Sequence, residues 1–227
     1  MLRHVGAVVL TPSEAPELFA LVERLAAIAG LPPPRVARAE TPMPNAFVAG
    51  RRPARSIVVV TAGSESTLSR EELAAVLAHE LAHVANRDVV VMTLATVPRT
   101  LAAELLGREG SAYVLAFVIW PIAAALWLLS SGLTLALSRY REYAADRGSA
   151  LITGEPEQLM SALQKIADGV ARIPAADLRS VRGLNAFFIV PTDLDRRGLE
   201  LLSDHPPLEK RLARLGDLAR EMGKPSP

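Results

Sequence analysis

Apolar positions recur every three or four residues in several parts of the chain, and this spacing predicts amphipathic helices. The first is expected over residues 14–29, with Ser13 as its N-cap, and Gly30 with the prolines after it ends this helix. Ser69 and Glu72 have the spacing of a capping box, so a second helix is expected from residue 70. Further helices are expected from near Ser138 and over residues 155–170 and 207–222, and β-like runs at residues 35–39, 46–49, 56–61 and 186–190.

The longest apolar stretch runs from Ser111 to Ser138 without a charged residue. Its length exceeds the roughly 20 residues that a helix needs to cross a bilayer. A buried core helix is the alternative, but an uncharged stretch of this length is unusual in a domain of this size. The N-terminal apolar run is too short for a signal peptide and has no cleavage-site pattern. The pattern therefore favours a membrane segment in the middle of the chain.

The composition of the chain limits the kinds of partner and the kinds of metal ligand that we expect. A net charge of +1 with both signs interspersed predicts no polyanionic partner, so nucleic-acid binding is not expected. The chain has no cysteine, which excludes disulfides, thiol catalysis and cysteine-ligated metal. A metal site in this protein must therefore use histidine and carboxylate ligands.

The run His79-Glu80-Leu81-Ala82-His83 lies on the predicted helix that begins at residue 70. Residues i and i+4 share one face of a helix, so both imidazoles can bind one metal ion. Glu80 lies beside them, where it can act as a general base toward water on the metal. A catalytic zinc site usually has three protein ligands. A third ligand must therefore come from another element.

The helix after the apolar stretch offers Glu142 and Asp146, four residues apart on one face. One carboxylate can bind the metal while the other accepts the outer N–H of a ligand histidine. Taken alone, a solvated charged helix is the better interpretation of this pair. The presence of the two-histidine helix reverses that preference.

Four ordered motifs carry a resemblance to a known family: Pro44-Asn45-Ala46-Phe47, His79 to Asp88, Arg139-x-x-Glu142-x-x-Ala145-Asp146, and His205-Pro206-Pro207 followed by Arg211. In these motifs the chain resembles the HtpX-like membrane zinc metallopeptidases, which share the glutamate-zincin fold with eukaryotic prenyl-protein proteases. The resemblance covers nearly the whole chain. It implies an α+β, mostly α fold: a zincin-type metalloprotease domain with a small β-sheet beside the active-site helix and an inserted apolar helical hairpin. Members usually carry two transmembrane helices ahead of the first catalytic-domain helix, which this sequence does not include.

The resemblance also implies roles for individual residues. One Zn²⁺ per chain would be bound by His79, His83 and Glu142, with Glu80 as the general base. Asp146 would lie behind a ligand histidine, most simply His79. His205 would donate to the oxyanion, with Arg211 a weaker candidate nearby, although a position next to a helix N-cap also explains His205. The strand Asn45-Ala46-Phe47 would bind an extended substrate, whereas for Asn86 and Asp88 the favoured interpretation is helix-end capping.

The proposed ligands constrain the membrane topology. His79 and His83 precede the apolar region and Glu142 follows it, so the intervening chain must cross the bilayer an even number of times. Two crossings predict a hairpin of residues 89–106 and 113–137, in which Arg99 and Glu104 occupy costly depths; an in-plane segment is the alternative. The expected organisation is an N-terminal catalytic part (1–88), the hairpin (89–137) and a C-terminal catalytic part (138–227).

The sequence thus predicts a membrane-associated zinc endopeptidase. The resemblance suggests quality control of misfolded membrane proteins in a bacterial cytoplasmic membrane, with lipid and protein substrates as partners. Arginines at the hairpin base, Arg87, Arg139 and Arg141, indicate a cytoplasmic catalytic face. Two alternatives stay open: processing of a specific substrate such as a lipidated C-terminus, or a zinc-binding membrane scaffold or regulator with little turnover. The sequence does not predict the oligomeric state.

Overall fold

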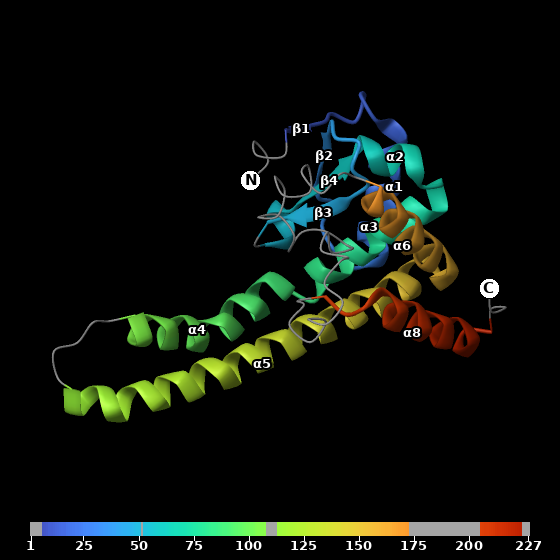
Figure 1. Cartoon of the computed structure of the whole chain (residues 1–227). Helices are drawn as coiled ribbons and strands as arrows, with labels where there is room; N and C mark the ends of the chain where they lie inside the picture. Colours follow the sequence, from blue (N-terminus) through green and yellow to red (C-terminus); the bar gives the residue numbers. More distant parts are fainter. Residues whose placement is uncertain (1–5, 51, 108–112, 173–204, 224–227) are drawn as a thin grey trace.

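The computed structural model describes residues 6–50, 52–107, 113–172 and 205–223 (Figure 1). A body of helices and a small sheet lies at one end, and two long helices extend from it. The strand predicted at residues 186–190 lies outside the described residues.

Within the described residues the sheet is mixed and has four strands, in the order β1-β2-β4-β3. Its strands are β1 (Ala7–Val9), β2 (Arg35–Ala39), β3 (Ala46–Ala49) and β4 (Ile57–Thr61). β2 and β4 are parallel, while β1 and β3 pair antiparallel to their neighbours. β4 is buried along its whole length and apolar up to Thr61, as expected of a strand covered on both faces. Among the described residues β3 is the last strand of this order, and its outer edge lies toward the helix that carries the histidines, where the Val48 amide donates to Glu80.

The helices of the body are α1 (Pro16–Ile28), α2 (Ala62–Thr67), α3 (Arg70–Ala85), α6 (Pro156–Ala171) and α8 (Leu208–Glu221). α1, α3 and α6 bury their apolar faces with one face of the sheet in the main core. The predicted capping box is present at the start of α3: the Ser69 side chain accepts from the Glu72 amide, and the Glu72 carboxylate accepts from the Ser69 amide. α1 begins at Pro16 rather than at residue 14, and Ser13 does not cap it.

The two long helices are α4 (Asp88–Gly107) and α5 (Tyr113–Thr153), which pack along each other away from the body (Figure 1). The prediction of a separate helix starting near Ser138 is wrong. The apolar and polar parts form one 41-residue helix, because nothing between Leu137 and Arg139 breaks the hydrogen-bond ladder. α5 therefore carries both the candidate membrane segment and the carboxylate pair Glu142 and Asp146 on one continuous helix.

Both helices contain segments long and apolar enough to cross a membrane, Asp88–Leu106 and Ile119–Thr153. Only 6% and 17% of the most apolar windows of these segments are buried. A soluble core helix would be mostly buried, so these apolar surfaces face the surroundings of the protein. The predicted fold class, a mostly helical α+β domain with a small sheet and an apolar helical hairpin, is confirmed.

Candidate metal centre and active site

α3 brings His79 and His83 to one face, as their i, i+4 spacing requires. His79 is buried at 1% exposure. The rings lie edge to face, with centroids 4.7 Å apart, and their Nε2 atoms are 3.2 Å apart. Both Nε2 atoms therefore face one small volume.

α5 brings Glu142 to the same volume. Its carboxylate oxygens lie 3.7 Å from His79 Nε2 and 3.6 Å from His83 Nε2. Metal–nitrogen and metal–oxygen bonds of about 2.1 Å in a tetrahedron place neighbouring ligand atoms about 3.4 Å apart. The three observed separations lie within a few tenths of an ångström of that value, so these residues fit one zinc-sized ion.

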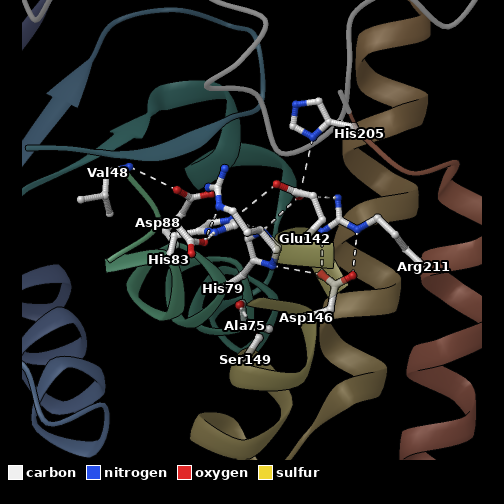
Figure 2. A network of polar contacts seen from close by, with 12 residues as sticks. Val48, Ala75, His79, His83, Asp88, Glu142, Asp146, Ser149, His205 and Arg211 are labelled. Atoms are coloured by element: carbon white, nitrogen blue, oxygen red, sulfur yellow. Dashed lines mark hydrogen bonds and ion pairs between the residues drawn. The ribbon is translucent and has the colours of Figure 1, made fainter. Parts of the chain in front are cut away.

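The outer nitrogens of both rings have carboxylate partners (Figure 2). His79 Nδ1 lies 3.0 Å from Asp146 Oδ1, and His83 Nδ1 lies 2.5 Å from Asp88 Oδ2. A carboxylate accepts, so each Nδ1 carries the hydrogen, and each neutral ring then presents a lone pair from Nε2. Two lone pairs 3.2 Å apart repel unless a cation lies against them. The two Nε2 atoms therefore have the arrangement of ligands to a metal ion, and when the metal is absent a proton can take its place.

The charge around His79 favours such a proton. Burial lowers the pKa of His79, but its close contacts with the Asp146 and Glu142 carboxylates outweigh the effect of burial and raise the pKa to about 9. Metal and proton therefore compete for this ring.

Glu80 lies on the same helix and is buried at 9% exposure. Its Oε2 accepts a hydrogen bond of 3.2 Å from the backbone amide of Val48, on β3. Burial raises the pKa of Glu80 above its usual range, and the contribution of Glu142 acts in the same direction. A carboxylate of raised pKa beside the ligand cluster has the position and basicity that a general base needs.

The remaining predicted residues surround Glu142. His205 Nδ1 lies 3.6 Å from Glu142 Oε2. Arg211, on α8, is buried at 1% exposure and donates to both oxygens of Asp146 at 2.6 and 2.9 Å, with Nη1 3.6 Å from Glu142. Contact of Arg211 with substrate stays a prediction. In the structure its guanidinium binds the carboxylate behind His79.

The predicted substrate strand is β3 and the residue before it. Asn45 is buried, and its carbonyl accepts from Thr61 and Ser64, which anchors the start of the strand. Ala46 and Phe47 are also buried, with Phe47 in the small cluster on the second face of the sheet. The anchored strand runs past Glu80.

Sequence reasoning missed the contact between Asp88 and His83, because it assigned Asp88 to helix capping. Arg87 adopts the left-handed region at φ 55°, which turns the chain sharply between α3 and α4. This turn brings the Asp88 side chain back onto His83. The signal in the sequence was an aspartate just past the end of a helix that carries two histidines.

Comparison with known proteins is consistent with this geometry. The model for peptidase family M48 matches residues 12–219. The chain belongs to this peptidase family. The prediction of an HtpX-like metallopeptidase is confirmed, and the chain is a metalloprotease.

Relatives at high identity are named for the same activity. The chain is 50% identical to a Protease HtpX homolog of Moorella thermoacetica, covering 98% of this chain and 78% of the relative. It is 45% identical to Protease HtpX homolog 2 of Methanosarcina acetivorans, covering 98% and 79%. Ste24p of S. mikatae has a similar fold, with a TM-score of 0.60 at 19% identity, covering 95% of this chain and 53% of Ste24p. The chain thus spans about half the length of that structure.

Proposed function

We propose that this chain is a membrane zinc endopeptidase that cleaves misfolded membrane proteins at the cytoplasmic face of a bacterial membrane. The observation that carries the proposal is the convergence of His79, His83 and Glu142 with ligand spacings of 3.2–3.7 Å beside the buried Glu80. The absence of cysteine favours zinc bound by nitrogen and oxygen.

A bound Zn²⁺ would supply Lewis acidity for the peptide carbonyl and acidify the attacking water. Glu80 takes the proton from that water and passes it to the leaving amine. His205, next to Glu142, is the proposed donor to the oxyanion. Asp146 and Arg211 hold the ring of His79 and take no proton themselves.

The outer edge of β3, on the side of Glu80, is the proposed place for substrate. An extended peptide can add to an edge strand through backbone hydrogen bonds, which select for unfolded chain rather than for particular side chains. Asn45, Ala46 and Phe47 would hold this edge in place. The Val48 amide, which now donates to Glu80, points toward the same edge.

The hairpin supports the membrane assignment. Large apolar side chains are exposed along α4 and α5, among them Leu94, Leu101, Phe117, Leu129 and Leu133. α4 leaves the body and α5 returns to it, so both ends lie on the same side (Figure 1). This arrangement suits two crossings with the arginines of the base in the cytoplasm.

The decisive experiment is zinc content measured beside cleavage of an unstructured protein, with the chain purified in detergent. We expect about one zinc per chain and cleavage that is lost in Glu80→Gln while zinc is retained. Glu71→Gln is the matched control, since Glu71 is an exposed acid on the same helix, and it should cleave normally. Undiminished cleavage by Glu80→Gln would refute the assignment of the base. Zinc binding without cleavage in the parent would favour the scaffold alternative.

A further inference from the structure

Asp88 is the first residue of α4 and is buried at 4% exposure, although it belongs to the helix whose apolar residues are largely exposed. Its Oδ2 lies 2.5 Å from His83 Nδ1. Helix capping alone would leave this carboxylate at the surface, against backbone amides. The side chain instead points into the cluster and meets a ligand ring.

A second contact holds Asp88 from the other helix of the hairpin. Arg141 Nε, on α5, lies 3.0 Å from the same Oδ2, and Arg141 directly precedes Glu142. Asp88 Oδ2 therefore contacts His83 on α3 and Arg141 on α5, and Asp88 itself is the first residue of α4. The three helices that meet at the candidate metal site are joined at this atom.

The geometry points to Asp88 as a positioning residue, which we propose fixes the ring orientation of His83 and is itself held by Arg141 at the root of the hairpin. It would do for His83 what Asp146 does for His79. The assignment rests on the proposed zinc site, and it adds that docking of α4 on α5 sets the geometry of one ligand.

The test is zinc affinity, measured by competition with a chromophoric chelator, beside thermal unfolding of the metal-free protein. Removal of a carboxylate behind a ligand histidine typically lowers metal affinity roughly 10–100-fold, and we expect this for Asp88→Ala. Asp88→Asn keeps an acceptor oxygen at the same reach, so it should restore part of the loss. It also keeps the test valid if the alanine variant does not fold.

Glu72→Gln is the matched control. Glu72 is a buried acid at the other end of α3 that binds Ser161 and Lys165, far along the helix from the ligands. Its replacement should lower the unfolding temperature and leave zinc affinity unchanged. If Asp88→Ala and Asp88→Asn behave like this control, with zinc affinity within twofold of the parent, the proposal is overturned.

The role of Arg141 is tested by a double-mutant cycle. Arg141→Ala removes a largely buried ion pair, with side chains 18% and 5% exposed, and should lower zinc affinity about two- to fivefold. If Arg141 acts through Asp88, the double variant binds zinc no worse than Asp88→Ala alone. Independent, multiplying losses would refute that link. A chain that cleaves no protein but shows these zinc affinities would contradict the proposed function while leaving the positioning role intact.

Discussion

The metal-free centre holds a proton on His79 at neutral pH, and that proton must leave before a metal can bind. The pKa of this ring is about 9. At pH 7 only about one molecule in a hundred then has the neutral ring that a metal requires. We expect the apparent zinc affinity to rise about tenfold per pH unit between pH 7 and 9 and to level off above.

The assay is competition for zinc against a chelator whose own protonation is corrected at each pH. Asp146→Asn is the control variant, because loss of the negative partner lowers the pKa of His79 and flattens the dependence above pH 7. A parent protein whose corrected affinity is constant from pH 7 to 9 would refute the reasoning.

The same proton affects stability. The pKa of His79 is raised on folding, so its contribution is complete below about pH 6.5 and is lost as the pH rises to about 9. A difference of this size corresponds to about 3 kcal/mol. The metal-free protein should therefore unfold more easily at pH 9 than at pH 6.5, whereas the zinc-loaded protein, whose His79 carries no such proton, should lack this loss.

Three further predictions concern helix packing, membrane insertion and a buried ion pair. A Cβ on Gly148 would lie 2.6 Å from Ala82 Cβ, so Gly148→Ala should push α5 away from α3. We expect this variant to be about 1–3 kcal/mol less stable and to bind zinc more weakly, as thermal melting and zinc competition would measure. Adding Ala82→Gly should restore both stability and zinc affinity. Leu129 is 73% exposed on the proposed membrane span, so Leu129→Arg should make the free energy of membrane insertion about 3 kcal/mol less favourable. More of this variant should then appear in the carbonate-soluble fraction. Leu151→Arg is the control, because Leu151 is exposed but lies beyond the uncharged stretch, and its fractionation should not change. Arg211→Met leaves the buried Asp146 carboxylate with His79 alone of its two partners and should destabilise the metal-free protein by about 3 kcal/mol in denaturant unfolding; an unchanged midpoint would contradict the pairing.

Local patterns in the sequence were sufficient for several elements. The capping box at Ser69 and Glu72 forms because its hydrogen bonds join residues three apart. The bounds of β2 and β3 agree with the prediction, since turn residues mark both ends. β1 and α2 were not predicted, because three and six residues show too little periodicity. The continuity of α5 was also missed: a change from apolar to charged residues alters the surroundings of a helix without ending it.

In the candidate metal centre, too, some features follow from the sequence and others only from the tertiary structure. The sequence by itself determined that His79 and His83 share a helical face with Glu80 between them, and that an uncharged stretch separates them from Glu142 and Asp146. Only the tertiary structure decided which carboxylate meets which ring. Those pairings depend on the left-handed turn at Arg87, on the close approach of Gly148 to Ala82, and on α8 placing Arg211 against Asp146. Spacing along one helix follows from the geometry of its backbone, but contacts between helices depend on how all of them pack, and no local pattern contains that information.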